Sequence, residues 1–187
     1  MKRIFKRLAI VLASLLVLLA AGGTWYVHSK QPQREGSLSL TGLSAPVSVR
    51  YDERGVPHIR AENEADLYRS LGYVHAQDRL FQMELMRRLA SGELAEVLGP
   101  KLVDVDRLFR TLELRLHAER HVAAMDKNSA PYRALGAYLD GVNEFQSGHP
   151  APVEFDLLGI PKRPFTRADT MAVVGFTAYS FAGALKA

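Results

Sequence analysis

The sequence contains no cysteine among its 187 residues. This absence excludes disulfide bonds, thiol nucleophiles, thiolate zinc sites and covalent haem attachment, so the fold must be held together by core packing. The sequence also lacks the motifs G-x-S-x-G, S-x-x-K, G-x-G-x-x-G and the P-loop. Its serines have no recognisable activating neighbour. Residue spacing alone therefore predicts no catalytic centre.

Acidic residues are absent from the first 34 positions, although the whole chain has 20 of them. The same segment holds six basic residues, which are Lys2, Arg3, Lys6, Arg7, Lys30 and Arg34. The remainder of the chain has 18 basic and 20 acidic residues and a net charge of −2, whereas the whole chain has a net charge of +4. The positive charge belongs to the N-terminal segment, so it predicts no nucleic-acid partner for the body.

The N-terminal segment begins with basic residues and continues as an uncharged apolar run. This pattern predicts that residues 1–27 are either a cleaved signal peptide, with small residues at Ala20–Gly23, or an uncleaved signal anchor. As an anchor, residues 8–27 would form an apolar span of about 20 residues, with Trp25 and Tyr26 at the membrane interface. In both cases we expect export, either to the periplasm or to the periplasmic face of the inner membrane.

Residues 28–36 form a polar linker, and residues 37–187 follow as one segment. Alternation of apolar and polar residues predicts a strand over 37–43. The stretch 47–60 predicts a β-hairpin, because Asp52–Gly55 supply turn residues between two strand-like runs.

Helical periodicity dominates the remainder of the chain. Three predicted N-terminal caps are Asn63 with Asp66, Ser129, and Thr166 with Asp169. The predicted helices run from Asn63 to about Leu89, over 93–98, over about 104–125, from Ser129 to about Phe145, and from Thr166 through "MAVVGFTAYSF", with a loop over 147–165. The last helix is apolar nearly all round, which predicts deep burial. The predicted fold class is mainly α with a short N-terminal β-hairpin.

The longest predicted helix places Asp78 at the centre of an apolar stripe. That stripe consists of Leu67, Leu71, Val74, Phe81, Leu85 and Leu89. A buried carboxylate without a partner is strongly destabilising. We therefore expect a structural polar network in which His75, Arg79 and Gln82 surround Asp78. A catalytic carboxylate is the alternative, although the sequence pairs Asp78 with no nucleophile.

The sequence "HAERH" places His117 and His121 one helical turn apart, as in zinc-binding helices. Glu119 follows His117 by two residues, whereas the metalloprotease pattern requires a glutamate directly after the first histidine. A solvated helix face is the favoured interpretation, and no metal ligand is predicted.

Five stretches, taken together, resemble the start of the penicillin acylase (penicillin amidase) family of N-terminal-nucleophile amidohydrolases. They are "YDERGVPHI", "ADLYRSLGYVHAQDRLFQME", "RRLASGELAEVLG", "LGAYLDGVNEF" and "PKRPFTRAD". The resemblance extends from about Val47 to the last residue. It implies that residues 37–187 are an incomplete α segment of the αββα fold, because "SFAGALKA" ends the chain within an apolar stretch.

The resemblance also implies a precursor in which a β segment follows the α segment and is its partner. Self-cleavage exposes a serine, or less often a cysteine or threonine, at the start of the β segment. That residue attacks the amide carbon with its own amine as base, and β-segment donors stabilise the oxyanion. The family's calcium site takes a glutamate from just after the helix matching "GFTAYSF". Calcium is therefore expected in the complete enzyme, but no ligand is assignable in this chain.

The resemblance places acyl-pocket side chains on the same helix. Thr177 and Phe181 occupy the matching positions, and Phe181 would offer an aromatic wall to an apolar acyl group. Ser180 stands where penicillin G acylases carry an arginine, and Thr177 stands where a methionine is expected. These departures put a penicillin-type substrate in doubt. Core packing alone is the other interpretation of these three residues.

The sequence supports two hypotheses about the function of the protein. The first is the α portion of an exported hydrolase that cleaves carbon–nitrogen bonds in linear amides of N-acyl compounds, such as β-lactam side chains or N-acyl homoserine lactones. This portion would be inactive alone, and Asp78 would serve folding and docking against the rest of the precursor. The second is a membrane-anchored helical binding module without catalysis.

Overall fold

The computed structural model describes residues 2–184, which form two compact units divided between Gln33 and Arg34. The first unit contains α1 (Lys2–His28). Within Arg3–His28 of this helix, a stretch of 18 residues has a mean hydropathy of 2.3, and none of that stretch is buried. The helix is long and apolar enough to cross a membrane, but a signal sequence has the same properties. The choice between anchor and cleaved signal stays a prediction.

The second unit begins with the predicted β-hairpin. Strands β1 (Ser48–Tyr51) and β2 (Pro57–Arg60) pair in antiparallel register. The Asp52 carboxylate closes the turn by accepting hydrogen bonds from the backbone N–H groups of Arg54 and Val56, both at 2.9 Å. The hairpin is therefore confirmed, and its turn chemistry is the one that aspartate and glycine predict.

The predicted strand over 37–43 is wrong, because this segment pairs with neither strand. Its leucines alternate for another reason. Leu40 packs against the hydrophobic core, whereas Leu38 is 42% exposed. Alternation of this kind reports which side chains face inward, but a strand also needs a hydrogen-bonding partner.

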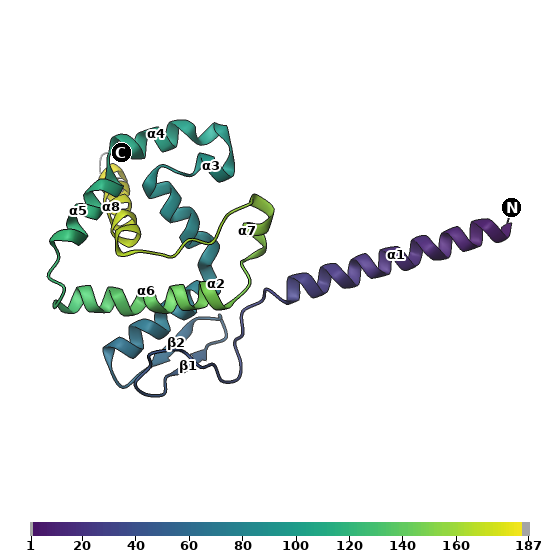
Figure 1. The fold of residues 1–187 in the computed structure, drawn as a ribbon, viewed down its shortest axis with the longest axis horizontal. Coiled ribbons are helices and arrows are strands. Elements are labelled where there is room, and N and C mark those ends of the chain that lie inside the picture. Colours follow the sequence, from purple (N-terminus) through teal and green to yellow (C-terminus); the bar gives the residue numbers. More distant parts are fainter. Residues whose placement is uncertain (1, 185–187) are drawn as a thin grey trace. The chain divides into compact units, whose positions relative to one another are not determined.

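Helices form the rest of the second unit, as predicted. They are α2 (Glu64–Ser91), α3 (Ala95–Leu98), the 3-10 turn η1 (Pro100–Leu102), α4 (Val103–Thr111), α5 (Leu114–Ala124), α6 (Ala130–Gly148), α7 (Val153–Leu158) and α8 (Arg167–Ala184). In Figure 1 the hairpin lies on one side of α6, and α4, α5 and α8 lie on the other. Helix α2 crosses α6 and extends into both halves.

The crossing of α2 and α6 depends on two glycines. A Cβ added to Gly72 would lie 1.9 Å from the carbonyl oxygen of Tyr138, and one added to Gly141 would lie 1.9 Å from that of Arg69. No side chain fits at such distances, so the two backbones touch. This contact brings Tyr73 of α2 into the main core, which also contains Phe145.

The three predicted N-terminal caps are present. Asn63 Oδ1 accepts the N–H of Asp66 at 2.9 Å, and Ser129 Oγ accepts the N–H of Tyr132 at 3.4 Å. Thr166 and Asp169 cap α8 reciprocally, as in a capping box. The Asp66 carboxylate differs from the expected capping box, because it accepts from the side-chain Nδ2 of Asn63 at 2.6 Å and from the hydroxyl and backbone N–H groups of residues 44–45.

Two predicted segments have boundaries that differ from the sequence pattern. The helix expected over 104–125 is divided into α4 and α5, with Glu113 in the left-handed region at φ 51°. The segment lacks glycine and proline, so its sequence contains no helix-breaking residue that would predict the break. The expected loop over 147–165 contains the short helix α7, whose Phe155 is 1% exposed and anchors it to the core.

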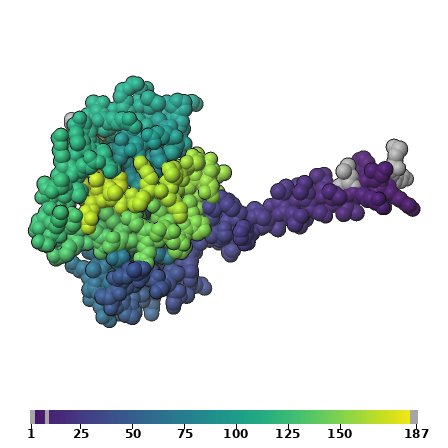
Figure 2. Space-filling model, in the orientation of Figure 1, coloured from purple at the N-terminus to yellow at the C-terminus, as the bar shows by residue number. Residues whose placement is uncertain are grey.

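The predicted deep burial of the last helix is wrong for its C-terminal half. Ala168, Asp169 and Ala172 near its start are buried, but the described side chains from Thr177 to Gly183 are exposed. Figure 2 shows α8, in yellow, on the visible face of this unit. Apolar composition predicts that a helix is covered but does not say by what, and within the described residues this half of α8 is uncovered.

Candidate functional site at helix α8

The three residues that the resemblance assigns to substrate binding lie on the exposed half of α8. Phe181 is 69% exposed, and Thr177 and Ser180 are also exposed. The two hydroxyls donate to carbonyl oxygens of their own helix, Thr177 to Val173 at 2.9 Å and Ser180 to Phe176 at 3.0 Å. Their polar atoms are thus already satisfied, so this face presents mainly hydrocarbon and an aromatic ring.

A cavity of about 470 Å³ lies beside the first half of α8, between this helix, α2 and α6. Most of its wall is apolar, with contributions from Met83, Met86, Leu139, Phe165 and Val173. Polar residues at the cavity include His75 and Tyr138, whose Nδ1 and hydroxyl oxygen are 2.6 Å apart. Burial raises the pKa of Tyr138 to about 12 and lowers that of His75, so both groups favour their neutral forms.

The cavity lies where α2 bends. Arg79 has non-helical dihedral angles, φ −137° and ψ 19°, so α2 consists of two helical pieces. A helical wheel assumes one continuous helix, and a bend changes the phase of every residue beyond it. The helical wheel also differs from the structure before the bend, where Leu71 of the predicted buried stripe is 40% exposed and Ala76 on the other face is buried.

Asp78 is therefore not the buried carboxylate that the helical wheel predicts. Its side chain is 17% exposed and forms an ion pair with Arg34 at 3.4 Å, near the start of the second unit. His75, the expected partner, is bonded to Tyr138. The proposed role of Asp78 in docking stays a hypothesis that the structure does not test.

The buried carboxylate of α2 is Glu84, whose side chain is fully buried. It accepts a hydrogen bond from Arg88 Nε at 2.7 Å and forms an ion pair with Arg87. Arg87 also donates to the carbonyl oxygens of Arg163 and Pro164 at 3.1 and 3.2 Å. The spacing of Glu84, Arg87 and Arg88 (i, i+3, i+4) could have predicted this cluster from the sequence.

Arg87 connects α2 to the start of α8. Its Nη1 lies 3.9 Å from a carboxylate oxygen of Asp169, and its guanidinium lies 4.1 Å from the ring centre of Phe165. Arg115 of α5 forms a second ion pair with Asp169. Burial lowers the pKa of Arg87, and the nearby Glu84 and Asp169 carboxylates partly offset that effect. These ion pairs fix the beginning of the helix on which the predicted substrate residues lie.

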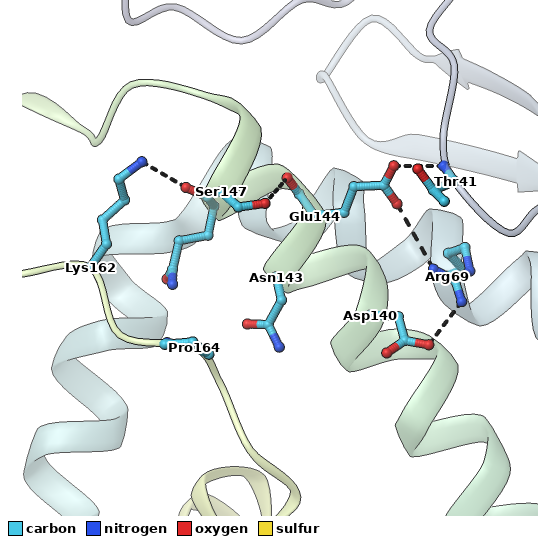
Figure 3. A pocket seen from close by; sticks show the side chains of 9 residues that line it. Thr41, Arg69, Asp140, Asn143, Glu144, Ser147, Lys162 and Pro164 are labelled. Carbon is cyan, nitrogen blue, oxygen red and sulfur yellow. Dashed lines mark hydrogen bonds and ion pairs between the residues drawn. The ribbon is translucent and has the colours of Figure 1, made fainter.

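A second pocket, of about 580 Å³, is polar and lies over α6 (Figure 3). Arg69 of α2 forms an ion pair with Asp140 at 2.8 Å and with Glu144 at 3.8 Å. Glu144 in turn accepts the backbone N–H of Thr41 at 2.6 Å, as Figure 3 shows. These polar groups bind one another and tie the segment before the hairpin to both helices, so the arrangement is structural in character.

The described residues do not form a metal site. His117 and His121 are both exposed on α5, and Glu119 is bonded to Arg115 at 2.7 Å. Within residues 2–184, no group of three or more histidine, cysteine, aspartate or glutamate side chains is arranged to hold a metal ion. Calcium binding by the complete enzyme stays a prediction.

Comparison with known proteins gives a consistent result. The penicillin amidase family model matches residues 46–187. The chain is 48% identical over 144 residues to a penicillin acylase 2 proenzyme of Pseudomonas sp. (strain SE83), covering 76% of this chain and 18% of that protein. It is 39% identical over 135 residues to the acyl-homoserine lactone acylase QuiP of Pseudomonas putida, covering 71% of this chain and 16% of that protein.

A solved structure supports the same relationship. A thermostable penicillin G acylase from Alcaligenes faecalis superimposes with a TM-score of 0.63 and 34% identity, over 74% of this chain and 75% of that chain. The chain spans less than a fifth of the length of either of these curated relatives.

Proposed function

The chain belongs to the penicillin amidase family, and on this premise we propose that it is the N-terminal, α-segment portion of an exported amidohydrolase that cleaves linear amide bonds of N-acyl compounds. The observation that carries the proposal is the family match, which extends over residues 46–187. The relatives' names include penicillin acylases and acyl-homoserine lactone acylases. Both groups remove an acyl group from an amine, so β-lactam side chains and N-acyl homoserine lactones are the candidate substrates.

The described residues supply binding surface to this reaction and no reacting group. Among the hydrogen bonds described for residues 2–184, none joins a serine or threonine hydroxyl to a histidine, which supports a nucleophile located elsewhere in the precursor. In the proposal, the nucleophile and the oxyanion donors come from a β segment of the same precursor. Thr177, Ser180 and Phe181 form one wall of the acyl site. Their exposure within this chain fits a surface that the β segment completes.

Export is the second part of the proposal, and α1 supports it. Helix α1 begins with basic residues and continues as an apolar span whose side chains are not buried. It serves either as a signal peptide or as an anchor in the inner membrane, and both place the body in the periplasm.

Activity measurements with two forms of the protein test the proposal. One form is the chain of residues 28–187 alone, and the other is the same chain with the downstream segment of its reading frame. We expect hydrolysis of N-acyl amides only in the second form, because only that form contains a nucleophile. Amide hydrolysis by residues 28–187 alone would contradict the proposal that the β segment supplies the nucleophile.

One observation favours a different function. Helix α1 and the absence of a nucleophile–base pair in the described residues also fit a membrane-anchored binding module without catalysis. A protein that stays in one piece when its whole reading frame is expressed, and hydrolyses no N-acyl amide, would support the binding module.

A further inference from the structure

The cavity beside α8 lies in line with the predicted acyl-binding face. Val173 belongs to the cavity wall, and Thr177 and Phe181 follow it at intervals of four residues. Residues four apart in a helix lie one turn apart on the same side. A single stripe of α8 therefore leads from the exposed Phe181 to the cavity.

The walls of this cavity suit a hydrocarbon. Met83 and Met86 of α2 face Leu139 of α6 and Val173 of α8 around a volume of about 470 Å³. Methionine side chains are flexible and polarisable, so they adapt to ligands of varying shape. Apolar cavities of this size with a few polar groups are typical of small-molecule sites.

Three charged residues line the cavity, Arg79, Arg87 and Asp169, and an ion pair joins Arg87 to Asp169. Arg87 and Asp169 neutralise each other at 3.9 Å, so the cavity offers no net charge for an anionic ligand from this pair. Arg87 is 2% exposed, and its Nε has no hydrogen-bond partner. A buried donor without an acceptor is destabilising, so an oxygen atom from water or from a ligand that reached this N–H would stabilise it.

We propose that this cavity is the distal part of the acyl-binding site and receives the far end of a medium-chain acyl group. The inference rests on the proposed function, because it extends the acyl wall formed by Thr177 and Phe181. Eight residues of helix separate Phe181 from Val173, which is about 12 Å along the axis. An extended hydrocarbon of about ten carbons covers that distance, given C–C bonds of about 1.5 Å in a zigzag. A decanoyl group therefore reaches the cavity, whereas an acetyl group does not.

Filling the cavity tests the inference in the full-length mature enzyme. We would compare Val173→Phe with the unmodified protein, using the 4-nitroanilides of acetic, hexanoic and decanoic acids as substrates. The matched control is Val174→Phe, because Val174 is the next residue, is 54% exposed and does not line the cavity. The readout is the ratio of kcat/KM for the decanoyl substrate to kcat/KM for the acetyl substrate.

We expect Val173→Phe to lower this ratio by about tenfold or more, because each methylene excluded from an apolar site costs about fourfold in binding. Val174→Phe should leave the ratio within about twofold of its original value. A ratio that falls equally in both variants, or in neither, overturns the inference and leaves the proposed hydrolase function intact.

Val173 also packs against a small buried cluster, so its replacement can prevent folding. A second measurement therefore uses the unmodified enzyme and a decanoic acid derivative with a diazirine at its terminal carbon. Photolysis should label peptides that contain Met83 or Met86, and unlabelled decanoate should compete. Labelling only outside the cavity would mean that another part of the protein fills it, which overturns the inference. If no N-acyl amide is hydrolysed, the proposed function fails, but labelling still reports whether the cavity binds the chain.

Discussion

Replacing Glu84 by glutamine removes the negative charge that two buried arginines share. The Glu84 side chain is fully buried, and those of Arg87 and Arg88 are only 3% and 4% exposed. Breaking a buried ion pair by removing one partner costs about 3–5 kcal/mol, because the remaining charge stays in a medium of low polarity. Domains have an unfolding free energy of about 5–15 kcal/mol, so this single substitution should remove a large part of the stability.

The chain offers a matched control for this prediction. Glu119 also pairs with an arginine four residues away in sequence at 2.7 Å, but its side chain is 51% exposed and that of Arg115 is 38% exposed. Exposed pairs contribute about 0–1 kcal/mol, so Glu119→Gln should change the stability by less than about 1 kcal/mol. The two substitutions are chemically identical and differ in burial.

Urea unfolding followed by far-ultraviolet circular dichroism measures both variants. We expect a large decrease in the midpoint for Glu84→Gln at an unchanged m-value, and a small decrease for Glu119→Gln that disappears at high salt. Equal effects of the two substitutions would refute the reasoning, because burial would then not determine the strength of these ion pairs.

Three further predictions concern the helix crossing, the first cap and the acyl wall. Gly141→Ala should destabilise the protein by several kcal/mol, since its Cβ would overlap a backbone carbonyl, whereas Gly148→Ala, with no atom within 4 Å of the new Cβ, should change the unfolding midpoint little. Hydrogen bonds from Ser44 lower the pKa of Asp66 from 3.8 to about 2. The stability that these bonds provide should therefore be present above about pH 4 and lost as the pH falls towards 2, and Asp66→Asn should remove this pH dependence of the unfolding free energy. Phe181→Ala should raise KM for an N-decanoyl amide in the mature enzyme. It should leave the unfolding midpoint of residues 28–187 alone unchanged, because the ring is 69% exposed in this chain, and a lowered midpoint would instead indicate a packing role.

Local signals in the sequence were sufficient for the elements whose ends are fixed by local hydrogen bonds. The hairpin turn at Asp52 and the caps at Asn63, Ser129 and Thr166 were all predicted from one or two residues, and the structure confirms them. In each case the side chain bonds to backbone groups within four residues, so the information lies in the immediate sequence.

The missed features depend on contacts between distant residues. The bend at Arg79 and the left-handed Glu113 interrupt helices without any glycine or proline at the break. Nearby tertiary contacts are the pairing of His75 with Tyr138 and the packing of Phe109 against Phe176, with ring centres 5.4 Å apart. A single-helix pattern does not contain these contacts, so it predicts neither interruption.

The candidate site came from a different kind of information. Thr177, Ser180 and Phe181 have no pattern of their own that indicates a ligand, and only the family resemblance selected them. The cavity at Val173 could not be predicted either, because it is formed by the bend of α2 against two other helices. Glu84, Arg87 and Arg88 did carry a readable signal in their helical spacing.

Intact-mass spectrometry of the protein purified after expression of its whole reading frame tests the central claim most directly. The account predicts two polypeptides where one was translated, with the smaller one containing residues 46–187 and the larger one beginning with serine, threonine or cysteine. A single uncut polypeptide that hydrolyses N-acyl amides would contradict it.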